Sequence, residues 1–253
     1  MNPDPLLLLA ATPAVAFAGV AKGGFGGAAA FAAAPMLAFA MPVTDAVGLM
    51  LPLLILMDVA ALRAYWGRWA RPARPALGVR LAPGAGFGCA RFEGLSPAAI
   101  QLALGAISLA FVGFRFAQRV GWRPAGASGW RPGRMAFWGS VAGLTSFVAH
   151  AGGPPVAMAL IPRALDKTAY QATVVIGFAV VNALKVPPYV ALGLIGPDTL
   201  VLAALLAPAA FLGVRLGVRM HRRVRQETFE AAVLVGLALA GAKLARDGAL
   251  DLL

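Results

Sequence analysis

Apolar runs of membrane-spanning length follow one another along nearly the whole chain, and only short polar or basic segments separate them. A helix needs roughly 17–25 mostly apolar residues to cross the hydrocarbon of a bilayer. The pattern predicts an all-α polytopic membrane protein. The unbroken runs predict long helices over residues 45–66, 76–92, 97–118, 168–194, 198–216 and 228–246.

Two further apolar runs are interrupted by glycine. The first contains the sequence KGGFGG at 22–27, and the second contains HAGGPP at 150–155. Glycine reaches positive φ without steric cost and lets another backbone or a ligand come close, so each interruption predicts a broken helix. The expected short helices lie at 6–21 and 26–40 around the first break, and at 135–149 and onward to about 162 around the second.

The two breaks divide the chain into similar halves. Gly26-Gly27 and Gly152-Gly153 lie 126 residues apart in a chain of 253. The sequence LAP and a later glycine, Gly88 in the first half and Gly213 in the second, also repeat at an offset of 125. We therefore expect a first membrane repeat at 1–118, a cytoplasmic linker at 119–134 and a second membrane repeat at 135–253.

The charge of the chain fits a membrane surface rather than a nucleic acid. The formal net charge is +12, but 60% of the residues are hydrophobic and the mean hydropathy is +0.79. The arginines gather in short segments between apolar runs, as the positive-inside rule describes for cytoplasmic loops. The expected surroundings are a lipid bilayer, and no nucleic acid is expected as a partner.

The arginine-rich segments exchange places between the halves. Residues 63–80 hold five arginines, whereas their counterpart at 189–205 holds none. Residues 91–97 hold one arginine, whereas their counterpart at 215–227 holds five. Equivalent loops are therefore expected on opposite sides of the membrane, which predicts an inverted repeat of the kind found in secondary transporters.

An inverted repeat needs an odd number of crossings in each half. Residues 135–162 are too few for two full spans, so each broken run is interpreted as a re-entrant hairpin that enters and leaves on one side. Each half then holds one hairpin and three transmembrane helices, and both termini are predicted to be periplasmic. If each broken run were a single span, the arginines of 215–227 would face outward, against the positive-inside rule.

The broken helices suggest a place for an anion. Free N–H groups and a positive dipole end are expected where a helix begins, and they attract small anions. Lys22 would add a full charge at the first break, and His150 would supply a donor or take up a proton at the second. The tandem prolines Pro154 and Pro155 lack N–H groups, so the second break offers fewer donors.

Structural roles compete with this interpretation. Glycine pairs in membrane helices commonly allow close packing, and Lys22 could reach an interface along its apolar stem. Asp58 lies in the middle of a predicted helix, where an ionisable group is a functional candidate, but it could also form an ion pair with Lys22 or Arg63. Asn182 could make a hydrogen bond between helices.

The candidates for substrate binding are the polar, glycine and neighbouring residues at the two breaks and on the helix after the second. They are Lys22, Gly23, Gly24, Phe25, Gly26, Gly27, His150, Ala151, Gly152, Gly153, Thr173, Asn182 and Lys185. Asp58 and His150 are the candidates for ion pairing or proton coupling. One cysteine and two histidines do not make the usual ligand set of a zinc site, and no metal or cofactor is expected.

The motifs resemble those of the sulfite exporter TauE/SafE family over nearly the whole chain. The resemblance rests on AGVAKGGFGG at 18–27 with Pro35, LPLLI at 51–55 with Asp58, AGGPP at 151–155 followed by Asn182 and Lys185, and LGVRLG at 212–217. It implies a bacterial inner-membrane carrier of two similar halves that moves sulfite or small organosulfonate anions outward, with loose coupling to the proton-motive force.

The expected function is therefore secondary transport of a small sulfur-containing anion by alternating access, and not catalysis. Lys22 and His150 are expected to approach one another between the halves. A passive anion channel and an intramembrane enzyme are the alternatives, although the chain lacks the GxSxG and HExxH motifs. The interpretation leaves proton coupling and oligomer formation open.

Overall fold

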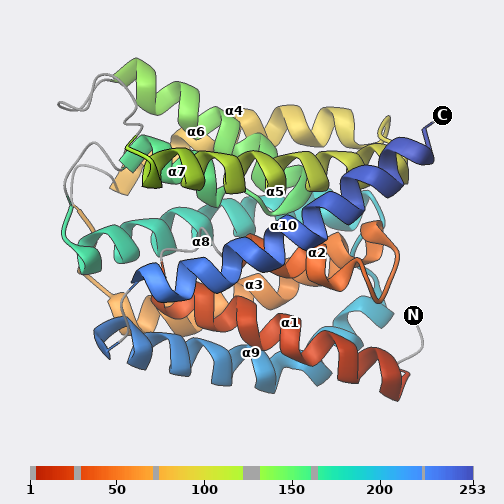
Figure 1. Cartoon of the computed structure of the whole chain (residues 1–253). Helices are drawn as coiled ribbons and strands as arrows, with labels where there is room; N and C mark the ends of the chain where they lie inside the picture. Colours follow the sequence, from red (N-terminus) through yellow and green to blue (C-terminus); the bar gives the residue numbers. More distant parts are fainter. Residues whose placement is uncertain are drawn as a thin grey trace.

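Helices make up the framework of the chain (Figure 1). The structure is a computed structural model, and it describes residues 4–25, 30–70, 74–121, 132–160, 165–223 and 226–252. The elements are α1 (Pro5–Gly24), the 3₁₀ helix η1 (Ala30–Ala32), α2 (Ala33–Leu37), α3 (Val43–Tyr65), α4 (Arg74–Phe92), α5 (Pro97–Arg119), α6 (Pro132–Ala149), α7 (Gly153–Leu160), α8 (Lys167–Ala191), α9 (Pro197–Arg223) and α10 (Gln226–Leu250).

Five of the described helices are long and apolar enough to cross a bilayer, which confirms a helical membrane protein. They are α1, α3, α5, α8 and the part of α9 at Pro197–His221. Both chain ends lie at the same end of the helix bundle (Figure 1).

Local chemistry explains where several helices begin. The side chain of Asp4 accepts a hydrogen bond from the backbone N–H of Leu6 at 3.0 Å. Ser96 likewise accepts from the backbone N–H of Ala99 at 3.1 Å, at the start of α5. Each oxygen satisfies an N–H that has no partner inside its helix, which fixes the first turn.

The first break differs from the prediction. The first helix continues to Gly24, so Lys22, Gly23 and Gly24 belong to α1 rather than to a loop after residue 21. The predicted helix at 26–40 is replaced by η1 and the five-residue α2. Gly26 and Gly27 lie outside the described residues. Close packing explains the longer α1, because α9 covers its glycine face.

The predicted segment 215–227 also needs correction. Helix α9 does not end at residue 216 but continues to Arg223, so Arg215 and Arg219 are helical residues. Arginine is a good helix former, and neither proline nor a turn motif stops the helix there. The second break agrees with the prediction, since α6 ends at Ala149 and α7 begins at Gly153.

The three most extensive helix contacts among the described residues each join a helix of the N-terminal part of the chain to one of the C-terminal part. Helix α1 of the first half packs along α9 of the second, while α6 of the second half packs along α4 of the first. Helices α5 and α10 also pack together. The N-terminal and C-terminal parts of the chain therefore pack into a single bundle.

Glycines allow these pairs to come close. A side chain at Gly84 of α4 would meet the carbonyl oxygen of Ser140 on α6, and one at Gly143 of α6 would meet that of Leu81. Gly217 of α9 faces Val20 of α1 in the same manner. Small residues at helix contacts are the usual way in which membrane helices gain packing energy, because lipid offers no hydrophobic driving force between them.

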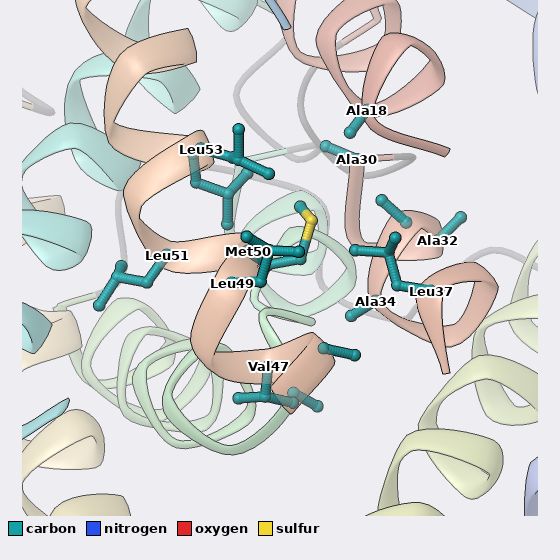
Figure 2. Packing of buried hydrophobic residues seen from close by; sticks show 14 of the residues in the cluster. Ala18, Ala30, Ala32, Ala34, Leu37, Val47, Leu49, Met50, Leu51 and Leu53 are labelled. Atoms are coloured by element: carbon teal, nitrogen blue, oxygen red, sulfur yellow. The ribbon is translucent and has the colours of Figure 1, made fainter. Parts of the chain in front are cut away.

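Alanines line the other side of the core around α3. Ala18 of α1 and Ala30, Ala32 and Ala34 of the η1–α2 segment face the leucine and methionine side chains of α3 (Figure 2). Met50 and its neighbours are completely buried there. The short α2 is thus held by packing rather than by its own length, and it brings the chain after the first break against the middle of α3.

The α4–α6 contact can be tested with a single methyl group. Gly84→Ala is expected to lower the free energy of unfolding by about 1–3 kcal/mol, the usual effect of overpacking, because the new Cβ would overlap the Ser140 carbonyl. The measurement is unfolding by SDS in mixed micelles. Gly86→Ala on the same helix is the control, since no atom lies within 4 Å of its Cβ position. Equal losses of stability in both variants would contradict the close contact.

Candidate functional site

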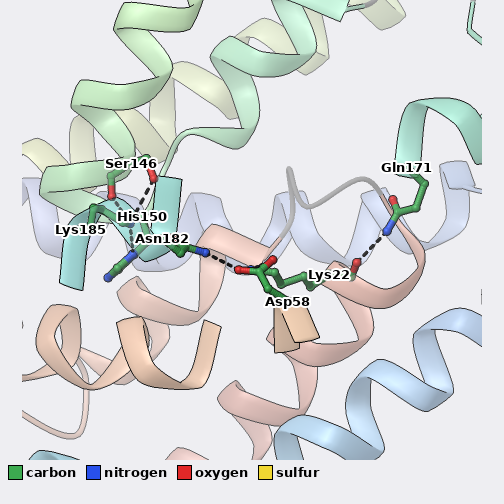
Figure 3. Close-up of polar contacts among 7 residues, drawn as sticks. All are labelled: Lys22, Asp58, Ser146, His150, Gln171, Asn182 and Lys185. Atoms are coloured by element: carbon green, nitrogen blue, oxygen red, sulfur yellow. Dashed lines mark hydrogen bonds and ion pairs between the residues drawn. The ribbon is translucent and has the colours of Figure 1, made fainter. Parts of the chain in front are cut away.

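A cluster of buried polar side chains lies where α1, α3, α6 and α8 meet (Figure 3). The exposed fraction is 4% for Lys22, 3% for Asp58 and 0% for Lys185. Burial of this kind is expensive for charged groups, so every hydrogen bond and ion pair in the cluster matters. The members are Lys22, Asp58, Ser146, His150, Gln171, Asn182 and Lys185.

Lys22 and Asp58 form the ion pair of the cluster. The ammonium of Lys22 on α1 lies 2.8 Å from Oδ1 of Asp58 on α3. The other carboxylate oxygen accepts a hydrogen bond from the side-chain amide of Asn182 on α8 at 2.7 Å. The structural roles considered for Asp58 and Asn182 are therefore both present, and Asp58 joins the first half of the chain to the second.

Lys185 has hydrogen-bond partners but no carboxylate. Its ammonium donates to the backbone oxygen of Ser146 at 2.9 Å and to the hydroxyl of Ser146 at 3.2 Å. It also lies 2.9 Å from Nδ1 of His150. These acceptors are neutral, and among the described residues Lys185 makes no ion pair. The cluster thus holds two lysines and one carboxylate.

His150 stands at the end of α6 in an unusual backbone conformation. Its φ is +52°, in the left-handed region that favours glycine, and among the described residues it is the one non-glycine with positive φ. The ring Nε2 lies 2.9 Å from the backbone oxygen of Val47 on α3. A carbonyl only accepts, so Nε2 carries a proton, and Nδ1 is then the acceptor for Lys185. His150 is neutral and bridges α3 to α8.

Residues at matching positions of the two predicted repeats bond to one another or make similar bonds in this region. Asp58 and Asn182 are 124 residues apart and bond to one another. Tyr65 donates through its hydroxyl to the carbonyl of Gly23, and Tyr189 donates to that of Phe147, each across 42 residues of chain. These tyrosine bonds tie the end of a broken helix to the following long helix in each half.

A small cavity lies inside the cluster. Its volume is about 20 Å³. The residues that line it come from the neighbourhood of both breaks and from α3 and α8: Lys22, Ala30, Leu54, Ser146, His150, Phe178 and Asn182. That space is about enough for one water molecule. Lys22 and His150 both line this cavity.

Other predicted site residues pack against a neighbouring helix or make hydrogen bonds to backbone groups. Gly23 and Gly24 press against Val214 and Gly217 of α9. Thr173 accepts from the backbone N–H of Ala70 at 3.0 Å and donates to the carbonyl of Ala169 at 2.7 Å.

The residues around the second break are also packed. Ala151, Gly152 and Gly153 are buried there, as Phe25 is at the first break. A side chain at Gly152 would meet Ser146 and Phe178. The cavity is lined by residues that carry polar side chains, among them Lys22, Ser146 and Asn182.

Several cluster members carry no signal in the sequence that separates them from ordinary helix residues. Ser146 and Gln171 are common polar residues, and Gln171 donates to the carbonyl of Lys22 at 2.6 Å. The spacing could have indicated Tyr65 and Tyr189, because both lie on the helices after the breaks, at the same 124-residue offset as Asp58 and Asn182. Among the described residues, no group of three or more metal-ligating side chains comes together.

Comparison with known proteins identifies the family. No curated protein and no solved structure gives a significant match to the chain. The family model described as "Sulfite exporter TauE/SafE" matches residues 11–244 and so includes both broken helices and the whole buried cluster. On this match, with its membrane-spanning helices, the chain belongs to the sulfite exporter TauE/SafE family, a family of membrane exporters of sulfur-containing anions.

Proposed function

We propose that this protein is a secondary transporter that exports sulfite or a small organosulfonate across the bacterial inner membrane by alternating access. The observation that carries the proposal is Lys185, which is fully buried and has only neutral acceptors. Asp58 attracts Lys185 through space but is in direct contact with Lys22. The cluster therefore has an unmatched positive charge, and an anion is the ligand that it suits.

The energetics favour an anion that moves in and out. A buried ammonium without a counter-ion loses several kcal/mol of hydration that neutral acceptors replace only in part. Sulfite and sulfonates carry charge on several oxygens, each able to accept hydrogen bonds. Bound near Lys185, such an anion would exchange its water for the ammonium and the Asn182 amide. We therefore assign Lys185 as the main anion ligand, with Lys22 as the partner of Asp58.

The cluster is closed in this conformation. The cavity of about 20 Å³ has room for one water, so an anion of several heavy atoms requires the helices to separate. The contacts that would open include the Asp58–Asn182 bond between α3 and α8, the long helices of the two halves. If the contact between α3 and α8 opens toward one side of the membrane and then toward the other, the result is alternating access in an inverted repeat.

His150 offers a route for proton coupling. In the neutral ring, Nδ1 accepts from Lys185 at 2.9 Å. A proton added at Nδ1 would place two cations in contact, and their repulsion would break this bond. An anion between them would offset the repulsion. Uptake of a proton and uptake of an anion would therefore favour one another at this site.

The proposed topology keeps two re-entrant broken helices and two periplasmic termini. The exchange of partners between α1 and α9 and between α6 and α4 supports two equivalent halves. The common position of both chain ends supports placing them on one side of the membrane (Figure 1). The arginine-rich segments then face the cytoplasm, as the positive-inside rule requires.

Removal of the unmatched charge tests the site. Lys185→Gln is expected to weaken sulfite binding about 10- to 100-fold, because a hydrogen bond to a charged group contributes about 1.5–3 kcal/mol. Calorimetry on purified, monodisperse protein gives the affinity. The double variant Lys22→Gln/Asp58→Asn is the control: it removes the ion pair but keeps the net charge of the cluster, so its affinity should stay near that of the wild type. If the double variant loses binding and Lys185→Gln keeps it, the assignment of Lys185 is wrong.

Flux measurements distinguish a carrier from a channel. In proteoliposomes, unlabelled sulfite on the inside is expected to accelerate uptake of labelled sulfite, because a carrier returns faster when loaded. Lys185→Gln and protein-free liposomes are the controls. Linear, unaccelerated uptake would favour the passive channel, and recovery of the label in a chemically altered form would favour an enzyme.

Thiol labelling tests the topology. The chain has one cysteine, Cys89 on α4, which is half-buried. In a Cys89→Ala background, Asn2→Cys is expected to react with a membrane-impermeant maleimide in whole spheroplasts. Ser128→Cys in the linker is expected to react only in inside-out vesicles. The reverse pattern, or labelling of both positions from one side, would overturn the inverted arrangement.

A further inference from the structure

A second, much larger pocket, called the groove below, lies between α3 and α9. Its volume is about 870 Å³, and no residue that lines the central cavity lines this one. Three arginines line it, Arg63 from α3 and Arg215 and Arg219 from α9. The remaining walls are apolar: two alanines of α3, and Phe211, Val214 and Val218 of α9.

The groove has an apolar part and a cationic part. Phe211, Arg215 and Arg219 are four residues apart on α9, so they form one stripe along the helix. The stripe begins with an aromatic ring and ends with two guanidinium groups. Arg63, in the last turn of α3, faces the groove from the other wall.

The arginines are available for an anionic ligand. Arg63, Arg215 and Arg219 are exposed, and within the described residues no hydrogen bond or ion pair engages them. Among the residues that the structure describes, no acidic one lines the groove. A guanidinium group matches phosphate oxygens in a two-pronged geometry, and here three of them surround one space.

The groove lies on a face that is suited to contact lipid. On α9, Leu205, Leu212 and Leu216 have exposed fractions of 51%, 65% and 50%. At least half of the surface of each side chain is exposed, as expected for a helix at the edge of a bundle in a membrane (Figure 1). A ligand that enters here comes from the bilayer, with its charged group beside the arginines and its chains against Phe211 and Val214.

We propose that this groove is a binding site for an anionic phospholipid. The phosphate would bind to Arg63, Arg215 and Arg219, and an acyl chain would lie along the apolar part of the α9 stripe. The three arginines fit the phosphate of such a lipid, and the aromatic ring that precedes two of them on α9 fits its acyl chain. A zwitterionic lipid fits less well, because its own cation would lie next to the arginines.

The site has a mechanical consequence. The opposite face of α9 presents Gly213 and Gly217 to α1, the helix that carries Lys22. A lipid held by Arg63 and Arg215 would link α3 and α9, and these two helices belong to different halves. Lipid binding would therefore stabilise the assembled halves without contact to the anion site.

Lipid titration of the delipidated, full-length protein tests the proposal. Native mass spectrometry is expected to show tighter binding of phosphatidylglycerol than of phosphatidylcholine with the same acyl chains. Arg215→Gln/Arg219→Gln is expected to reduce the phosphatidylglycerol affinity about 25-fold, from about fivefold for each arginine near a membrane surface. Arg63→Gln, on the other helix, is expected to reduce it about fivefold.

Arg119→Gln is the matched control, because Arg119 is an exposed arginine at the end of α5 that does not line the groove. It should bind phosphatidylglycerol like the wild type, and gel filtration should show all variants monodisperse. The proposal is overturned if the groove variants bind phosphatidylglycerol as the wild type does. It is also overturned if inorganic phosphate at micromolar concentration displaces the lipid, since the groove would then be a site for soluble anions.

Discussion

The structure depends on the ion pair and hydrogen bonds that stabilise charged side chains inside a helix bundle surrounded by lipid. Two ammonium groups and one carboxylate are buried together, and each is held by partners from another helix. Asp58 is in contact with Lys22 and Asn182, so removing it would leave a buried cation and an amide without their acceptor. Because these bonds join α1, α3 and α8, the charge pairing also fixes how the two halves meet.

Close helix packing makes this pairing feasible. Lys22 reaches Asp58 because α1 lies against α9 and the η1–α2 segment lies against α3, contacts that glycine and alanine allow. The same small residues leave little free space around the polar groups. Tight packing around the cluster strengthens its electrostatic interactions.

The second break places the side chain of His150 within the buried cluster. Helix α7 begins with Gly153 and two prolines, which offer few donors. The break instead turns the chain at His150, whose ring connects Val47 to Lys185. A strained backbone conformation is retained where it positions a functional group, and the bridging ring at the junction of the halves is consistent with that.

The sequence alone determined the helical membrane class, the two breaks, the approximate bounds of the long helices and the family, because these depend on local hydropathy, glycine and motif order. It also indicated Lys22, Asp58, His150, Asn182 and Lys185, since polar residues inside apolar runs are visible without coordinates. Only the tertiary structure decided which of them pair. Lys22 pairs with Asp58, whereas Lys185 bonds to neutral acceptors. These partners depend on how α1 and α8 are positioned along α3 and α6. Helix packing sets those positions, and sequence spacing does not. Continuation of α1 through Gly24 and of α9 to Arg223 was likewise settled by contacts between distant helices, which a local pattern does not contain.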